Sequence, residues 1–249
     1  MNASDWDAIA KDYHSCIVSP FQEGVINPLF KKVSEIDTSN MVAADIGCGC
    51  GDALGFLSSK FKKVYAIDYS KAMLSQARKK CNSPNVDFFL KDMKDLSEFE
   101  SKFDVAVSVN SVLFSNISDL KKALESIRST MKDDGMFFGI FPSMGSILYQ
   151  GFLILDDQLS KCGDEQSAEK ITKRILEKDR YDFVKGTYDD GDCVQKFYYE
   201  FELKIRLQDA GFKNVKLSKV LYPYREDISD FEMFEGRPKM WDWFVTARK

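Results

Sequence analysis

The sequence VAADIGCGCG, residues 42–51, decides the fold of this chain. It begins with a short apolar run, which is typical of a strand buried in a parallel sheet. Three alternating glycines, Gly47, Gly49 and Gly51, follow directly. Glycine lets the backbone turn sharply and lets a ligand approach where a side chain would clash. The stretch predicts a strand, a tight loop that binds a ligand, and the start of a helix.

Four more short apolar runs follow this stretch, and amphipathic segments separate them. The runs are residues 64–67, 86–90, 105–109 and 136–141. Ser70 is a typical N-cap before one helical pattern, and a second pattern over residues 120–131 is expected to stop at Asp134 and Gly135. The repeated strand–helix–strand order predicts a right-handed α/β layer fold.

The pattern changes after Pro142. Residues 143–196 are mostly helical in pattern and fit no further repeat, and a helix ending near Gly211 comes next. Two further strands are expected at residues 215–222 and 241–247, close enough in sequence to be antiparallel partners. We therefore expect one domain, 1–249, in four parts. These are an N-terminal helical cover at 1–40, a ligand-binding core at 41–142, a helical cap for the substrate at 143–196, and a closing helix with two strands at 197–249.

Composition excludes several classes of function. The 249 residues include 35 Lys and Arg against 39 Asp and Glu, for a formal charge of −4, and this balance argues against a nucleic-acid partner held by charge. A single histidine, His14, and six cysteines without a C-x-x-C pair argue against a metal site. No apolar run approaches the roughly 18–20 residues of a membrane span, and the polar N-terminus is unlike a signal peptide. We expect a cytoplasmic protein that does not bind membranes.

Two acids follow the next two predicted strands. Asp68 ends the second strand, 21 residues after Gly47, where a carboxylate can accept both hydrogen bonds of a ribose diol. Asp92 follows the third strand, where a carboxylate can accept a hydrogen bond from the exocyclic amine of adenine. Simpler interpretations remain open: a tight turn for the glycines, a helix-entry acid for Asp68, and a solvated loop acid for Asp92.

Taken together, these motifs resemble those of the class I S-adenosylmethionine-dependent methyltransferases. The matching stretches are residues 42–51, 67–70, 73–74, 77–78 and 92–93, together with the lead-in WDAIAKDY at 6–13 and the later core motifs at 103–104 and 120–141. A nicotinamide-dependent dehydrogenase typically carries G-x-G-x-x-G, which the Cys50-Gly51-Asp52 segment breaks. The resemblance implies a Rossmann-like, seven-stranded, mostly parallel sheet flanked by helices, with a helical cap insertion after strand 5.

The resemblance also implies the cofactor, S-adenosylmethionine, with S-adenosylhomocysteine as the product. The implied cofactor-binding residues are Asp45, Gly47, Cys48, Gly49, Gly51, Asp68, Tyr69, Met73, Asp92, Met93 and Asn110. By this resemblance Asp45 lies beneath the loop near the amino group, Tyr69 and Met73 border the adenine, and Met93 helps Asp92 to reach its edge. Asn110 is expected beside the methionine tail and the methyl group, unless it only starts the next helix. No metal is implied.

The catalytic residues and the acceptor stay open. Methyl transfer is an in-line displacement that depends first on alignment, and only a hydroxyl acceptor needs a base. Tyr13 and His14, on the lead-in helix, are the candidates for that base. The expected acceptor is a small molecule. The alternatives are an RNA or protein acceptor, or a non-catalytic S-adenosylmethionine-binding subunit that acts through a partner.

Aromatic residues concentrate in the last part of the chain and in the insertion. The clusters are 197–199 with Phe201, then 222–224 and 241–243, and the insertion adds Tyr149, Phe152, Tyr181 and Tyr188. Such residues can line a pocket for a flat or cationic acceptor, or they can simply pack the core.

Overall fold

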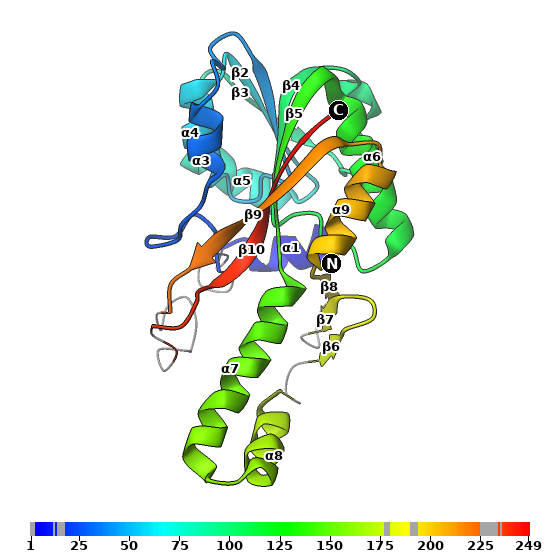
Figure 1. Cartoon of the computed structure of the whole chain (residues 1–249). Coiled ribbons are helices and arrows are strands. Elements are labelled where there is room, and N and C mark those ends of the chain that lie inside the picture. The colour runs from blue at the N-terminus through cyan, green and yellow to red at the C-terminus, as the bar shows by residue number, and fades with distance from the viewer. Residues whose placement is uncertain are drawn as a thin grey trace.

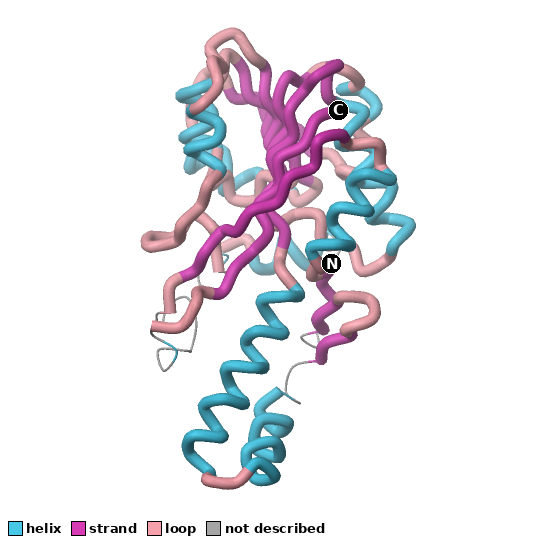
Figure 2. Tube along the Cα trace, in the orientation of Figure 1, coloured by secondary structure: helices cyan, strands magenta, loops and turns pink. Residues whose placement is uncertain are grey.

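The fold is built on one seven-stranded sheet. We describe a computed structural model, in which residues 3–11, 13, 18–176, 180–189, 194–224, 234 and 236–249 are described. The strand order is β3-β2-β1-β4-β5-β10-β9 (Figures 1 and 2). The bounds are β1 Val42–Ile46, β2 Lys63–Asp68, β3 Val86–Leu90, β4 Phe103–Val109, β5 Met131–Phe141, β9 Lys213–Tyr222 and β10 Met240–Arg248.

The order of these strands confirms the expected architecture. β1 to β5 pair in parallel, and β10 is antiparallel to both of its neighbours, β5 and β9. The predicted antiparallel partnership of the last two strands is therefore correct. The direction in which strands are added reverses at β1: the chain first adds β2 and β3 on one side of β1 and then adds β4 on the other side. The loops after β1 and β4 therefore diverge and leave a crevice at the carboxyl edge of the sheet.

Helices cover both faces of the sheet (Figure 1). One layer contains α3 Leu29–Ser34, α4 Leu54–Lys60 and α5 Lys71–Lys80, and the other contains α6 Ile117–Thr130 and α9 Glu200–Asp209. Buried leucines from each layer pack on the sheet, for example Leu57 and Leu74 on the first face and Leu124 and Leu203 on the second. Such two-sided burial explains why the central strands are almost entirely apolar.

Helix α6 is shorter than its apolar spacing suggests. It begins at the Asn116 cap, whose side chain accepts from the backbone N–H groups of Ser118 and Asp119, and it ends at Thr130. Met131 already belongs to β5 and pairs with Phe103. The expected stop at Asp134 and Gly135 is therefore wrong by one helical turn, because Met131 is buried as a strand residue rather than as a helix residue.

The insertion is helical only in its first part. α7 Met144–Cys162 and α8 Glu165–Leu176 form a pair that projects from the sheet, as Figure 2 shows. Residues 180–196 form a three-stranded antiparallel sheet instead, with β6 Arg180–Asp182, β7 Thr187–Asp189 and β8 Val194–Lys196. The expectation of a helical cap therefore needs correction there, because three-residue strands are too short to show a period of two.

A buried ion pair fastens this small sheet to the body. Lys196 is fully buried, its Nζ lies 2.8 Å from Glu202 Oε2 on α9, and it donates to the Lys185 carbonyl at 2.6 Å. Burial lowers the pKa of Lys196, although its bond to Glu202 opposes that shift. The position of β8 is therefore coupled to α9.

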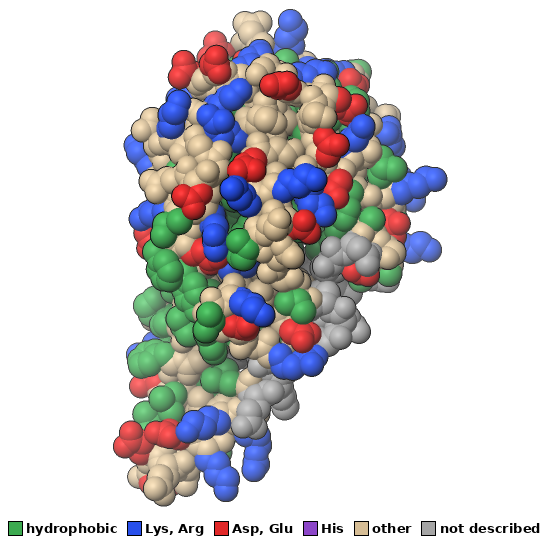
Figure 3. All heavy atoms as spheres, turned by 90° about the vertical axis from the view of Figure 1, so that its right-hand side faces the viewer, with side chains coloured by type: hydrophobic (Ala, Val, Ile, Leu, Met, Phe, Trp, Pro, Cys, Tyr) green, Lys and Arg blue, Asp and Glu red, His purple; other side chains and the backbone are tan. Residues whose placement is uncertain are grey.

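The surface carries charges of both signs. Over the face in Figure 3, Lys and Arg side chains alternate with Asp and Glu, and hydrophobic side chains gather toward the projecting half. Among the described residues, the large exposed apolar side chains of the projecting helix pair include Leu148 and Phe152 of α7 and Ile171 and Ile175 of α8. No helix among the described residues is long and apolar enough to cross a membrane.

Candidate active site

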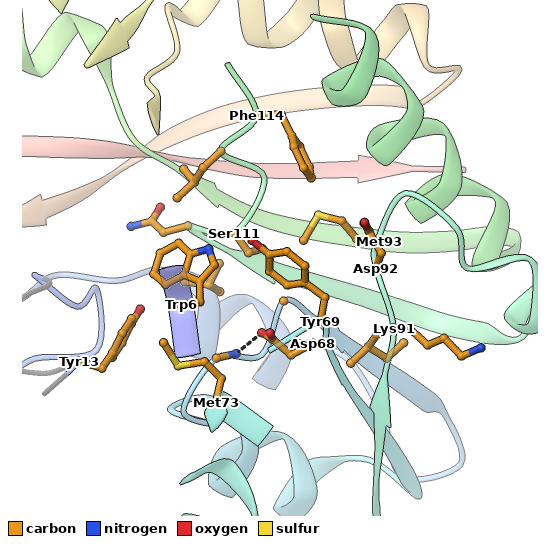
Figure 4. Close-up of a pocket in the computed structure, with 16 residues that line it drawn as sticks. Trp6, Tyr13, Asp68, Tyr69, Met73, Lys91, Asp92, Met93, Ser111 and Phe114 are labelled. Carbon is orange, nitrogen blue, oxygen red and sulfur yellow. Dashed lines mark hydrogen bonds between the residues drawn. The ribbon is translucent and has the colours of Figure 1, made fainter. Parts of the chain in front are cut away.

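The loops after β1, β2, β3 and β4 surround a cavity at the carboxyl edge of the sheet. Figure 4 shows its lining, in which the rings of Trp6 and Tyr69 lie toward the middle and Met73, Met93 and Phe114 lie around them. The described lining is Trp6, Tyr13, Gly47, Gly49, Ile67, Asp68, Tyr69, Met73, Lys91, Asp92, Met93, Val109, Asn110, Ser111, Leu113 and Phe114. The first cavity therefore brings together Gly47, Gly49, Asp68, Tyr69, Met73, Asp92, Met93 and Asn110 of the predicted set.

The three glycines of the loop have different surroundings. A Cβ on Gly47 would lie 2.3 Å from Ser111 Cβ, so this glycine lets the β4 exit pass close by. Gly49 has a φ of +51° and no atom within 4 Å of a Cβ, so it leaves an open cradle where a ligand can approach. Gly51 lines neither this cavity nor the one beside it and instead packs on Ala77 of α5. It therefore serves the loop's packing on α5.

Asp68 holds the loop and still faces the cavity. Its Oδ2 accepts from the backbone N–H of Gly49 at 2.9 Å, the dashed bond in Figure 4, and its Oδ1 accepts from the N–H of Ser70 at 2.9 Å. Burial raises the pKa of Asp68 despite these bonds. A carboxylate has about four lone-pair positions, so Asp68 can accept further hydrogen bonds from a diol.

A second buried acid lies beneath the loop. Asp45 is 2% exposed, and burial, followed by the charges of Asp68 and Asp52, raises the pKa of Asp45 to about 7. Like charges that share a buried site disfavour each other's ionisation, whereas a nearby cation favours it. The loop therefore combines an open cradle with a negative potential, which suits a ligand that carries positive charge.

Asp92 ends β3 with a turn of its own. Its Oδ1 accepts from the backbone N–H of Lys94 at 2.9 Å, and its Oδ2 lies 3.7 Å from Lys94 Nζ. The carboxylate is about two-fifths exposed at the rim of the cavity. Asp92 is therefore placed at the opening, beside the buried thioether of Met93.

Helix α1, Ala3–Ile9, covers the cavity from the N-terminal segment. Asp7 anchors it, because its Oδ1 accepts from Ser70 Oγ and from the backbone N–H of Ala72, the latter at 2.9 Å. Those groups belong to the start of α5, where Ser70 also caps Met73. Trp6 on the same helix is thereby held over the cavity, which makes this segment a cover for the site (Figure 4).

Of the two candidate bases, Tyr13 is the one that lies among the described residues. Tyr13 lines both cavities, and burial, with the charge of Asp52 next in importance, raises the pKa of its hydroxyl. Its hydroxyl therefore stays protonated at neutral pH and is a hydrogen-bond donor rather than a base. His14 lies outside the described residues.

A second, larger cavity adjoins the first. It has a volume of about 430 Å³ and shares Trp6, Tyr13, Gly47, Gly49, Val109, Asn110 and Leu113 with the first cavity. Asp45 and Cys48 of the predicted set open here rather than into the first cavity. Its other sides are closed by Ile147 and Gln150 of α7, by Gln195 of β8, and by Phe197, which follows β8. The insertion therefore contributes to this cavity, as a cap for a substrate is expected to do.

Asn110 links the two cavities through a polar network that sequence reasoning missed. Its Nδ2 donates to Asp242 Oδ2 at 3.0 Å, and Tyr222 Oη donates to the same oxygen at 2.6 Å. Asn110 Oδ1 is buried and has no hydrogen-bond partner among the described residues. Asn110 also has a φ of +44°, which asparagine tolerates better than most residues. It is therefore more than the start of the next helix.

Few aromatic residues of the sequence clusters line the site, and several of them pack the core instead. Tyr198 is fully buried and donates to the Val112 carbonyl, and Trp243 donates to the Tyr198 carbonyl. Tyr181 stacks on Tyr188 within the small sheet. Only Phe197 and Tyr222 of these clusters line the second cavity. Within the described residues no group of three His, Cys, Asp or Glu could hold a metal.

Comparison with known proteins gives this geometry a family. A family model described as a methyltransferase domain matches residues 43–135. An uncharacterized protein of Methanocaldococcus jannaschii is 31% identical over 230 residues, which cover 90% of this chain and 79% of that protein. The malonyl-[acyl-carrier protein] O-methyltransferase of Bacillus anthracis is 26% identical over 145 residues, or 57% of this chain and 51% of the relative. The chain thus spans about half the length of that relative.

A solved structure agrees at the level of the fold. The S-adenosylmethionine-dependent methyltransferase of Methanosarcina mazei superposes with a TM-score of 0.59 at 16% identity, covering 90% of this chain and 97% of that one. The chain belongs to the class I S-adenosylmethionine-dependent methyltransferases, as the glycine loop and the strand order already indicated. The methyltransferase domain is that of an enzyme, and the cofactor of its family is S-adenosylmethionine.

Proposed function

We propose that this enzyme transfers a methyl group from S-adenosylmethionine to a small molecule held in the second cavity. The observation that carries the proposal is the continuity of the two cavities, which share the glycine loop and Asn110. A cavity of about 430 Å³ is of the size that small-molecule sites commonly have. The acceptor can thereby lie next to the cofactor.

The first cavity, together with Asp45 from the adjoining second cavity, offers suitable partners for each part of the cofactor. We assign the ribose diol to Asp68 and the adenine to Tyr69, Met73, Asp92 and Met93, with Trp6 above them. Gly49 leaves room for the ribose and the methionine chain, and the backbone of Gly47 lines the same cavity. Asp45, together with the unpartnered Asn110 Oδ1, suits the amino group. Bound S-adenosylmethionine supplies a methyl carbon on a sulfonium sulfur, and the protein's task is alignment.

The experiment that tests this proposal follows the label. Purified enzyme is incubated with methyl-labelled S-adenosylmethionine and cell extract, and the extract is then separated into small molecules, RNA and protein. We expect label in the small molecules. Label confined to RNA or protein contradicts the proposal while leaving the family assignment intact.

A pair of variants on α7 tests the cavity itself. Ile147→Trp fills the second cavity, and Leu148→Trp, one position along, adds the same bulk to a side chain that is 49% exposed. We expect Ile147→Trp to lose transfer to the small molecule and to keep its affinity for S-adenosylhomocysteine. Leu148→Trp is expected to behave like the unmodified enzyme. Equal activity of both variants would place the acceptor elsewhere.

A further inference from the structure

We propose that the methyl acceptor is an amine, and that Asp242 is the carboxylate that binds the reacting nitrogen. This inference rests on the function proposed above, since it concerns the contents of the second cavity. It names the chemical class of the acceptor and a residue of β10 that contacts it.

Among the described residues, the charged side chains that line the second cavity are all of one sign. Among the described residues that line it there is no lysine, arginine or histidine, whereas three aspartates, Asp45, Asp52 and Asp242, do line it. Asp52 has its own cation, because Lys80 Nζ pairs with its carboxylate. Asp45 lies beneath the glycine loop, which both cavities share, and we assigned it above to the amino group of the cofactor. Asp242 is therefore the acid left for the acceptor.

Asp242 is held in place by its neighbours. Tyr222 Oη and Asn110 Nδ2 both donate to its Oδ2, and the backbone N–H of Ser143 also stabilises the charged form. Burial nevertheless raises the pKa of Asp242, so these partners do not compensate its burial completely. A carboxylate can accept about four hydrogen bonds, so Asp242 keeps capacity for the N–H of a ligand.

The uncharged part of the lining also suits a cationic nitrogen. Trp6, Tyr13, Phe197 and Tyr222 present aromatic rings to the cavity. Ring faces attract cations within about 6 Å, and the attraction grows when water is excluded. Burial raises the pKa of the Tyr222 hydroxyl, so Tyr222 remains a donor to Asp242 and does not become a second anion.

The same lining disfavours an acidic acceptor. A carboxylate taken from water into this cavity would approach Asp242 with no described cation to compensate it, and buried charges of like sign are strongly unfavourable. The relative from Bacillus anthracis is named for transfer to malonyl-[acyl-carrier protein], whose malonyl group ends in a carboxylate. The second cavity of this chain is unsuited to such a group.

The chemistry balances with Asp242 as proton acceptor. An amine that enters as its ammonium ion gives one proton to the Asp242 carboxylate. The freed lone pair of nitrogen bonds to the methyl carbon as the carbon–sulfur bond breaks, and the bonding pair stays on sulfur as a thioether. The product leaves as the N-methylated ammonium ion of the acceptor, and Asp242 returns its proton to water.

Binding measurements with matched probes test the inference. We use the enzyme saturated with S-adenosylhomocysteine and add benzylamine, benzyl alcohol or benzoate at about 10 mM, which detects even millimolar affinities. The shift in melting temperature is expected to be largest for benzylamine and absent for benzoate. A larger shift with benzoate, or no shift with benzylamine, overturns the inference. Failure of S-adenosylhomocysteine itself to bind would instead contradict the cofactor site of the proposed function.

Variants then assign the effect to one carboxylate. Asp242→Asn is nearly isosteric, and we expect at least about tenfold weaker benzylamine binding with unchanged S-adenosylhomocysteine affinity, because a charge-assisted hydrogen bond is lost. Asp133→Asn is the control, since Asp133 is fully exposed, and it should leave benzylamine binding unchanged. Tyr222→Phe is a second test, which serves if Asp242→Asn does not fold. It leaves the Asp242 carboxylate in place, so it should still bind benzylamine in preference to benzoate. Benzylamine binding that survives Asp242→Asn, or a Tyr222→Phe variant that prefers benzoate, overturns the assignment.

Discussion

Gly47 and Ser111 pass each other so closely that a Cβ on Gly47 would lie 2.3 Å from Ser111 Cβ and 2.6 Å from its Oγ. Ser111 Oγ in turn donates to the Ile46 carbonyl at 3.1 Å. The glycine loop and the exit of β4 therefore form one packed unit. The first glycine is required by the protein itself, whereas the second, Gly49, leaves space for a ligand.

This difference predicts that alanine at Gly47 mainly lowers stability, whereas alanine at Gly49 mainly weakens cofactor binding. Gly47→Ala should lower the free energy of unfolding by about 2–4 kcal/mol, because both the positive φ and the contact with Ser111 are unfavourable. Gly49→Ala should cost only about 1 kcal/mol, for its φ alone, but should weaken S-adenosylmethionine binding. Chemical denaturation and calorimetry measure the two effects. Equal stability of the two variants would contradict the close contact.

Asp68→Asn should weaken S-adenosylhomocysteine binding by about tenfold or more. The amide of asparagine keeps one acceptor oxygen, so the loop bonds to Gly49 and Ser70 can be partly retained, but it loses the charged acceptor for the ribose diol. Calorimetric titration measures the affinity, and circular dichroism verifies the fold. Unchanged affinity in a folded variant would show that Asp68 does not hold the ribose.

Asp45 should make the stability of the ligand-free enzyme depend on pH. Its pKa is about 7 in the folded chain, against 3.8 without burial, so the folded state binds the proton more tightly. The stabilising contribution is complete below about pH 4 and is lost as the pH rises through 7, up to about 4 kcal/mol in all. Asp45→Asn should gain melting temperature over the unmodified enzyme between pH 5 and 8, and at pH 8 it should bind S-adenosylmethionine less tightly. A pH-independent difference would contradict the assignment.

Tyr13→Phe should retain most of the methyl-transfer rate between pH 6 and 8. Because burial raises the pKa of the Tyr13 hydroxyl, its phenolate is scarcely populated in this range and its removal takes away no base. A loss of about 100-fold or more, comparable to removal of a general base, would restore Tyr13 as a catalytic residue. The rate is compared with that of His14→Gln, which tests the other candidate.

The buried pair of Lys196 and Glu202 should matter much more than an exposed pair nearby. Lys196→Met leaves Glu202 without its nearest cation, and we expect a loss of about 3 kcal/mol in unfolding free energy. The control is Lys204→Met, because Lys204 and Glu200 form an exposed pair on the same helix, for which at most about 0.5 kcal/mol is expected. Similar losses for the two variants would show that β8 is not held by this ion pair.

The sequence predicts the parallel core well, because residues 42–141 carry their structural information locally. Each buried strand is a short apolar run, and two of the helices begin at a side-chain cap, Ser70 before α5 and Asn116 before α6. The polar residues of the first cavity follow strand ends, so topology alone brings them to one edge. The small sheet at residues 180–196 was not predicted, because strands of three residues show no measurable alternation of apolar and polar side chains.

The acceptor side could not be predicted in the same way. Asp242 is 132 residues from Asn110 in sequence, and it lies between Trp241 and Trp243 in what looks like an ordinary strand. Its place beside the cavity depends on β10 being inserted against β5, which no local pattern reveals. A single charged residue at the start of an apolar strand, after the sheet order is known, is the signal that would have identified it.

The insertion of β10 between β5 and β9 also has a consequence for biosynthesis. Strand β9 meets the main sheet only through β10, so β9 leaves the ribosome before the strand that will hold it has been made. Until β10 has been made and has paired with it, β9 offers unpaired backbone groups to other chains. The strand that carries Asp242 is therefore made after all five parallel strands of the cofactor-binding half, and β9 can join the sheet only once β10 has been made.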